Sequence, residues 1–325
     1  MKKIIMIIAI MFITISLTGC GNKNQVVVYT SMEEERNQVL SKMLKEKFPD
    51  INVAVQYMAT GNSAAKVKNE GTNVEADIIL DLETAHMESL KDNFADITNF
   101  DTSYYVDGVN NSDNYVIWVK SPISLIIDKD YFNKNKLSIP KTYADLLKPE
   151  YKDLIAMPDP KTSGTGYAFY LNVVNEMGEE DAIKYFKKLK NNLREFTTSG
   201  SGPTNLLKQK EVAIAMGMIS QGVAAINEGY NFEIVELDTG TLYSTTSAGV
   251  IKGRETDKNV VDVFNYIIGE FNKYDKENYI PSDIIKDLDI VIENFPTDLK
   301  DADMTGIENM EIKDKLTKKW EEVNG

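Results

Sequence analysis

The feature that most constrains the fold is an alternation of short apolar runs and amphipathic segments near the start of the chain. Residues 26–29 are continuously apolar, which is typical of a strand buried in a parallel sheet. Ser31 and Glu34 match the S-x-x-E capping box that begins a helix. Residues 51–55 and 76–80 indicate two further strands. This β-α-β-α-β order predicts a parallel, doubly wound α/β sheet.

The middle of the chain repeats this pattern. Strands are predicted at 154–157, 212–216 and 233–237, and helices at 167–176 and 181–190. No long linker or short-period repeat separates the two halves. We therefore expect an α/β protein built from two doubly wound lobes of similar construction.

Composition excludes several classes of function. The chain has 325 residues, of which 42% are hydrophobic and 26% charged, as in an ordinary globular protein of about two domains. Its net charge of -14 leaves no basic surplus to bind nucleic acid. With one His and one Cys it has neither a Cys₂His₂ zinc site nor an internal disulfide. Nucleophilic catalysis would depend on His86 alone, so we expect no enzyme, cofactor or metal site.

The N-terminus reads as an export signal. Lys2 and Lys3 precede an apolar run, residues 4–17, that is shorter than the roughly 20 residues of a membrane-spanning helix. The following Leu-Thr-Gly-Cys at 17–20 resembles the lipobox of bacterial lipoproteins. That resemblance implies a signal peptide at 1–19, a lipid on Cys20, a tether at 20–25, and anchoring at the extracellular face of the bacterial membrane. The alternative is an ordinary secreted protein with an unpaired thiol.

Candidate ligand-binding residues follow the predicted strands. In open α/β sheets, ligands bind beyond the carboxyl ends of the strands. Here most of those ends carry small hydroxyl residues, glycine or acids. The candidates are Thr30, Ser31, Thr60, Gly61, Asn62, Ser63, Asp81, Glu83, Ser163, Gly164, Thr165, Gly166, Tyr167, Ser199 and Ser201.

These loops favour an anionic ligand. Helix N-termini expose unpaired N–H groups and a partial positive charge, glycines let a ligand approach the backbone, and hydroxyls add donors. A phosphate or carboxylate can be bound in this way without Arg, which occurs only at 36, 194 and 254. For any single loop, an ordinary cap or turn explains the residues equally well. Their repetition at several strand ends favours the anion site.

Taken together, the segments resemble the extracellular solute-binding proteins of ABC importers with the type II periplasmic-binding fold. More narrowly, they resemble the branch that binds ferric ion, 2-aminoethylphosphonate or sugar phosphates. The segments that carry the resemblance are 27–31 (VVYTS), 75–78 (EADI), 142–147 (TYADLL), 163–167 (SGTGY), 198–203 (TSGSGP), Gly240-Thr241 and 248–253 (AGVIKG).

The resemblance implies two lobes joined by crossing strands, with the ligand in the cleft between them. Lobe one would comprise 26–124 and 240–325, and lobe two 125–239. Hinge closure would capture the solute. The implied partners are permease and ATPase subunits, and we expect a monomer. Thr241 joins the candidate ligand-binding residues on this basis.

This sequence differs from members of that branch at two places, and both differences restrict the choice of ligand. Ferric-binding members carry a Tyr-Tyr pair in the loop that matches 217–222, which here has no tyrosine, although Fe(III) prefers anionic oxygen ligands. Sugar-phosphate members tend to carry His-Asp where this chain has Ser220 and Gln221. The leading hypothesis is therefore a phosphonate or phosphate ester such as 2-aminoethylphosphonate. Ser220 and Gln221 would line the lobe-two side, and Asp81, Glu83 and Asp238 would pair with an amine.

Three alternatives remain open from the sequence. One is ferric iron held with a synergistic anion. Another is thiamine or a thiamine phosphate, which needs an aromatic platform such as Tyr57, Tyr167 or Tyr243. The third is an adhesin or sensor that uses the binding fold without transport.

Overall fold

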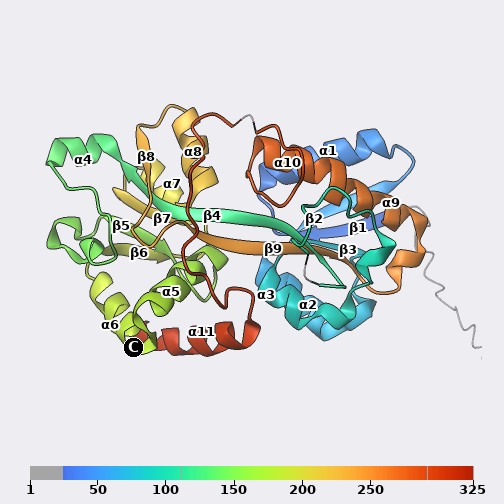
Figure 1. Cartoon of the computed structure of the whole chain (residues 1–325), viewed down its shortest axis with the longest axis horizontal. Helices are drawn as coiled ribbons and strands as arrows, with labels where there is room; N and C mark the ends of the chain where they lie inside the picture. The colour runs from blue at the N-terminus through green and yellow to red at the C-terminus, as the bar shows by residue number, and fades with distance from the viewer. Residues whose placement is uncertain (1–24, 111, 291, 325) are drawn as a thin grey trace, which may run out of the picture.

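The computed structural model describes residues 25–110, 112–290 and 292–324 (Figure 1). The predicted signal peptide, the lipidation site Cys20 and residues 21–24 of the tether lie outside this range. Within the described ranges, no helix combines the length and the apolar character needed to cross a bilayer.

The molecule is an elongated mixed α/β structure with helices on the faces of one sheet (Figure 1). The strands are β1 (Gln25–Thr30), β2 (Asn52–Tyr57), β3 (Ile78–Glu83), β4 (Val116–Asp128), β5 (Ile155–Pro158), β6 (Leu193–Thr197), β7 (Ile214–Met218), β8 (Phe232–Val235) and β9 (Leu242–Val250). The helices are α1 (Glu34–Lys47), α2 (Thr60–Glu70), α3 (Thr84–Ser89), α4 (Lys129–Asn135), α5 (Gly164–Met177), α6 (Glu179–Leu189), α7 (Gly202–Lys208), α8 (Ile219–Asn227), α9 (Lys258–Tyr266), α10 (Asn272–Asn278) and α11 (Met310–Asn324), with a π-turn at Ile267–Phe271 between α9 and α10.

The sheet has nine strands in the order β2-β1-β3-β9-β4-β7-β5-β6, and β8 pairs with β4 off this path. At one end, β1 pairs in parallel with β2 and β3; at the other, β5 pairs in parallel with β6 and β7. Each parallel group is connected through helices, as the right-handed crossover of a β-α-β unit requires. The predicted α/β class and the two similar halves are confirmed.

Two long antiparallel strands join the halves. The first part of β4 pairs with β9 beside the β1–β3 group, as Val116 opposite Ala248 shows. The last part of β4 pairs with β7 and β8, for example Ile127 opposite Ile214. The hydrophobic core divides at the same place, because Val119 belongs to one buried cluster and Ile123 to the other. The strands β4 and β9 therefore cross between two lobes, each with its own core (Figure 1).

The C-terminal tail departs from the expected assignment of 240–325 to lobe one. Helices α9 and α10 do pack in the first core, but Leu316, Trp320 and Val323 of α11 belong to the second. These three side chains recur at helical spacing and form one apolar stripe. Trp320 is fully buried, and its ring lies 5.0 Å from that of Tyr170 and 4.9 Å from that of Phe186. The tail therefore completes lobe two.

The role of α11 can be tested by replacing Trp320 with alanine. Removing a fully buried indole leaves a cavity in the lobe-two core, so we expect the free energy of unfolding to fall by about 3–5 kcal/mol. Chemical denaturation followed by circular dichroism measures this change. The matched control is Lys318→Ala on the exposed face of α11, which should change the stability by no more than about 0.5 kcal/mol. A comparably small effect of Trp320→Ala would show that α11 is not part of the core.

Candidate ligand-binding cleft

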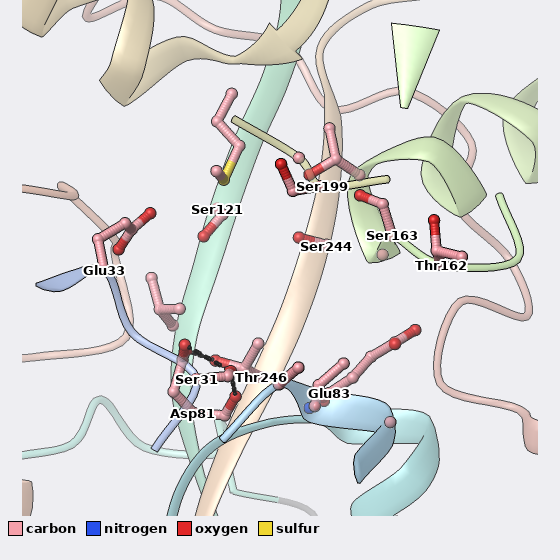
Figure 2. Close-up of a pocket in the computed structure, with 18 of the residues that line it drawn as sticks. Ser31, Glu33, Asp81, Glu83, Ser121, Thr162, Ser163, Ser199, Ser244 and Thr246 are labelled. Atoms are coloured by element: carbon pink, nitrogen blue, oxygen red, sulfur yellow. Dashed lines mark hydrogen bonds between the residues drawn. The ribbon is translucent and has the colours of Figure 1, made fainter. Parts of the chain in front are cut away.

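A cavity of about 250 Å³ lies between the two lobes, where the strand ends of both halves meet (Figure 2). From lobe one it is lined by the end of β3 and by residues that follow β1 and β2, and from lobe two by the end of β7 and by residues that follow β5 and β6. The crossing strands contribute their middle residues. This is the position at which open α/β folds bind ligands.

The structure brings many of the predicted residues together in this cavity. Those that line it are Ser31, Thr60, Gly61, Asp81, Glu83, Ser163, Gly164, Thr165 and Ser199. They come from five separate strand-end loops and from both lobes.

Several lining residues were missed by the sequence analysis. Ser121 of β4 and Ser244 and Thr246 of β9 project from the crossing strands into the cavity (Figure 2). The hydroxyl-rich run 244–247 within β9 was the available signal, but only the pairing of β4 with β9 shows which lobe boundary it faces. Other missed lining residues are Glu33, Arg36, Ala59, Val119, Thr162, Thr198, Gly200, Met218, Thr245 and Ile280.

The first residues of two helices line the cavity from opposite lobes. Helix α2 begins at Thr60, and helix α5 begins at Gly164 with Ser163 as its N-cap. The Ser163 hydroxyl accepts a hydrogen bond from the Gly166 N–H at 3.4 Å. Loop 198–200 lies against the same helix start, since a Cβ on Gly200 would lie 2.7 Å from the Thr165 hydroxyl. The arrangement offers N–H and O–H donors to an anion.

Asp81 is a buried carboxylate in the wall of the cavity. It occupies a bulge in β3 with a left-handed backbone (φ 60°), which only a few residue types tolerate. Its carboxylate accepts hydrogen bonds from the Ser31 hydroxyl at 3.0 Å and the Thr246 hydroxyl at 2.6 Å. Burial raises the pKa of Asp81 to about 6, against the opposing charge of Arg36. The predicted capping role of Ser31 is therefore wrong: its hydroxyl serves Asp81, and Glu33 is the N-cap of α1.

Arg36, the cation that lines the cavity, already forms ion pairs within the protein. Its guanidinium donates to both Asp275 oxygens, at 2.7 and 2.8 Å, and to Glu33 at 2.9 Å. Burial alone would raise the pKa of Asp275, but the charges of Arg36 and Lys276 outweigh it and hold that pKa below its usual range. Burial lowers the pKa of Lys276, which lies 4.5 Å over the Trp118 ring. Little positive charge is left for a ligand, so anion binding depends on neutral donors.

Three predicted residues of lobe one do not line the cavity. Thr30 is buried in the strand, and its hydroxyl accepts from the Met32 N–H at 3.2 Å. Asn62 is exposed on the outer side of α2. The Ser63 hydroxyl is buried beneath the helix and makes no hydrogen bond to the residues described. Only one face of each helix turn or strand can reach the cleft.

The predicted residues of lobe two divide in the same way. Gly166 is required for packing, because a Cβ there would lie 2.3 Å from the Pro158 carbonyl oxygen. Tyr167 is buried in the lobe-two core rather than in the cleft. Ser201 lies behind Ser199, with the two hydroxyls 3.2 Å apart. The cavity is lined instead by Thr165 and Ser199, which lie one or two positions closer to the strand ends.

Four further residues predicted to bind the ligand do not line the cavity. Ser220 and Gln221 lie within α8, and Met218 at the end of β7 takes the lining position. Asp238 is exposed in a turn where its N–H donates to the Lys141 carbonyl, so it is no partner for a ligand amine in this cavity. The Thr241 backbone is held by the tail, its N–H donating to the Lys300 carbonyl at 2.7 Å.

Of the three tyrosines proposed as aromatic platforms, only one lines the cavity. Tyr57 lines the cavity and is 64% exposed. Tyr167 is in the core, and Tyr243 lies under the Lys120 ammonium, 4.5 Å from the ring centre. Among the residues that the structure describes, no group of three or more His, Cys, Asp or Glu side chains is placed to hold a metal ion.

Comparison with known proteins identifies related chains. A family model described as bacterial extracellular solute-binding protein matches residues 46–282. A Salmonella typhimurium protein named "Putative 2-aminoethylphosphonate-binding periplasmic protein" is 24% identical over 230 residues, which cover 67% of this chain and 65% of that protein.

Solved structures share the fold over nearly the whole described chain. The periplasmic binding protein AfuA from Actinobacillus pleuropneumoniae, with fructose-6-phosphate bound, is 19% identical with a TM-score of 0.76, covering 92% of this chain and 98% of that one. A periplasmic thiamin binding protein is 16% identical, also with a TM-score of 0.76, covering 93% and 96%. At these identities the likeness shows the two-lobed fold and leaves the ligand undetermined.

The raised pKa of Asp81 predicts a specific pH dependence of stability. Because the folded pKa lies near 6 and the usual value is 3.8, the native state binds this proton more tightly than the unfolded chain. The resulting stabilisation is present at low pH and is lost as the pH rises through 6. In Asp81→Asn that loss is absent, so the variant should gain about 2 kcal/mol relative to the wild type between pH 4 and pH 7. Urea denaturation at both pH values measures it. Asp50→Asn, at an exposed position, is the control, and equal pH profiles for all three proteins would contradict the assignment.

Proposed function

We propose, because the chain belongs to the bacterial extracellular solute-binding protein family, that it captures a small organophosphorus solute with an ammonium group, such as 2-aminoethylphosphonate. It delivers this solute to the permease and ATPase subunits of an ABC importer. The lipid expected on Cys20 keeps it at the extracellular face of the membrane.

The observation that carries the proposal is a cavity rich in neutral donors between two helix N-termini. Ser163, Gly164 and Thr165 face it from lobe two, and Thr60 and Gly61 from lobe one. A tetrahedral phosphonate has three oxygens, each able to accept hydrogen bonds, which suits donors arriving from several directions. Because both lobes contribute donors, the anion binds most tightly when the lobes close on it.

The ammonium group is matched by Asp81. Its carboxylate is buried in the cavity wall and is oriented by Ser31 and Thr246. A ligand ammonium would favour the ionised carboxylate and offset its burial. A phosphonate without an amine lacks this compensation. The carboxylate therefore supports a zwitterion over a simple anion.

A thiamine phosphate is the second candidate, and Tyr57 is the observation in its favour. The ring lines the cavity and is 64% exposed, so a heterocycle can stack on it. No aromatic ring faces it from lobe two among the described lining residues, which are Thr162, Ser163, Gly164, Thr165, Thr198, Ser199, Gly200 and Met218. A small aliphatic zwitterion fits this asymmetry better.

The anion site can be tested with the double variant Ser163→Ala, Thr165→Ala. Losing two hydroxyl donors to a charged group should weaken 2-aminoethylphosphonate binding by on the order of 100-fold. Isothermal titration measures this, with thiamine phosphate and ferric citrate as the competing ligands. Ser201→Ala, Ser220→Ala is the matched control outside the cavity and should bind like the wild type. Unchanged affinity in the first double variant would overturn the site, and tight binding of a competitor alone would overturn the ligand.

The amine site is tested by pairing one substitution with two ligands. Asp81→Asn removes the carboxylate charge, so 2-aminoethylphosphonate should bind about 10- to 100-fold more weakly, while ethylphosphonate, which lacks the amine, should be little affected. Asp238→Asn, at the predicted amine partner that lies outside the cavity, should leave both affinities unchanged. Equal losses for both ligands in Asp81→Asn would show that Asp81 does not recognise the amine.

A further inference from the structure

One ion pair connects the two lobes across the cavity. Glu83, the last residue of β3 in lobe one, accepts a hydrogen bond from the Lys313 ammonium of α11. Each side chain is only 9% exposed. Lys313 lies beyond residues 46–282, which the family model matches. The tail therefore places a buried charge beside the cleft.

The Glu83 carboxylate also stands in front of helix α5. A Cβ on Gly164 would lie 3.6 Å from the Glu83 carboxyl carbon and from Oε2. Figure 2 shows Glu83 reaching from the lobe-one side toward Ser163 and Thr162 on the other. Its backbone is fixed in lobe one, where the Glu83 N–H donates to the Thr60 hydroxyl at 3.1 Å. One side chain thus contacts both walls of the cavity.

Lys313 is fixed to the opposite lobe. Its ammonium lies 5.0 Å from the centre of the Tyr167 ring, which is in the lobe-two core. Leu316 and Trp320, one and two turns further along α11, anchor the helix in the same core. Figure 1 shows α11 beginning near α3 of lobe one and ending beside α6 of lobe two. When the lobes rotate apart, Glu83 and Lys313 must separate.

We propose that Lys313 is a positioning residue of the cleft, which holds Glu83 across the lobe boundary and so stabilises the closed arrangement before a ligand binds. Removing one partner of a buried ion pair is strongly destabilising, because it leaves the other charge buried without compensation. The Lys313 ammonium also compensates the negative charge of Glu83, which leaves Asp81 as the carboxylate that faces a ligand ammonium. This statement about the ligand ammonium is the only part of the inference that rests on the proposed function.

The effect on binding follows from the closed population. A ligand that binds the closed form has an apparent dissociation constant equal to the intrinsic value divided by the closed fraction. Weakening the pair lowers that fraction and weakens binding, although Lys313 itself does not line the cavity. Lys313 therefore affects affinity without lining the cavity.

The first test needs no ligand. In the full chain carrying Cys20→Ser, nitroxide labels at Gln38→Cys in lobe one and Lys184→Cys in lobe two report the distance between lobes by pulsed electron resonance. Lys313→Met should shift the distribution toward longer distances. The matched control is Lys315→Met, which breaks an exposed ion pair to Glu179 on the outer side of α11 and should leave the distribution unchanged. An unchanged distribution in Lys313→Met would overturn the proposal.

A charge-reversed variant distinguishes the loss of the ion pair from misfolding caused by the substitution. Glu83→Lys combined with Lys313→Glu keeps an ion pair of opposite polarity and should restore the short distances. Lys313→Arg should retain them as well. Long distances in both of these variants, with native circular dichroism, would show that the ion pair does not hold the lobes together and would overturn the proposal.

A titration with 2-aminoethylphosphonate separates this proposal from the proposed function. Lys313→Met should bind about tenfold more weakly, and Lys313→Arg, which keeps the ion pair and leaves every lining residue unchanged, should retain the wild-type affinity. Wild-type affinity in Lys313→Met, with a longer distance between the lobes, would show that the pair does not control binding and would overturn the positioning role. If the wild type does not bind 2-aminoethylphosphonate, the proposed ligand is wrong, and the distance measurement still decides the role of Lys313.

Discussion

The backbone pairing of β4 with β9 is the constraint on which the rest of the molecule depends. These strands hydrogen-bond to each other through the lobe boundary and are joined to β3 on one side and β7 on the other. They therefore tie the two lobes together. Alternation along the strands directs Ser121, Ser244 and Thr246 into the cavity, so the strands that connect the lobes also form the floor of the site.

The electrostatics of the cleft rest on local geometry rather than on net charge. The chain carries a net charge of -14, and Arg36, the cation of the lining, is engaged by Asp275 and Glu33. At physiological salt, exposed charges beyond about 8 Å are largely screened. Oriented N–H and O–H groups at short range are not, and they cost no reorganisation when a ligand arrives. A protein with an acidic surface can therefore still hold an anion, provided that the anion is enclosed.

The sequence was sufficient for β1, β2, β3, β5 and β7, because a buried strand and an amphipathic helix have different periodicities, but it did not predict the parallel strand β6. It also located Ser31, Asp81 and Ser163, since strand ends of one sheet must meet at one edge. It could not separate neighbours such as Thr30 and Ser31, because a shift of one residue reverses the side-chain direction. The crossing strands and the position of α11 depend on partners far along the chain. The helical spacing of the apolar residues in α11 would be the same whether the helix packed in lobe one or in lobe two, so the sequence does not assign it to a lobe.

The route of the chain between the lobes makes each core depend on segments far apart in the sequence. The first core combines β1–β3 with β9, α9 and the segment Ile267–Phe271, and the second combines β5–β7 with Leu316 and Trp320 of α11. Contacts of such large sequence separation slow folding, because their loop-closure entropy is lost before they form. Lobe two is therefore sealed by a segment that joins it across a long stretch of lobe-one sequence.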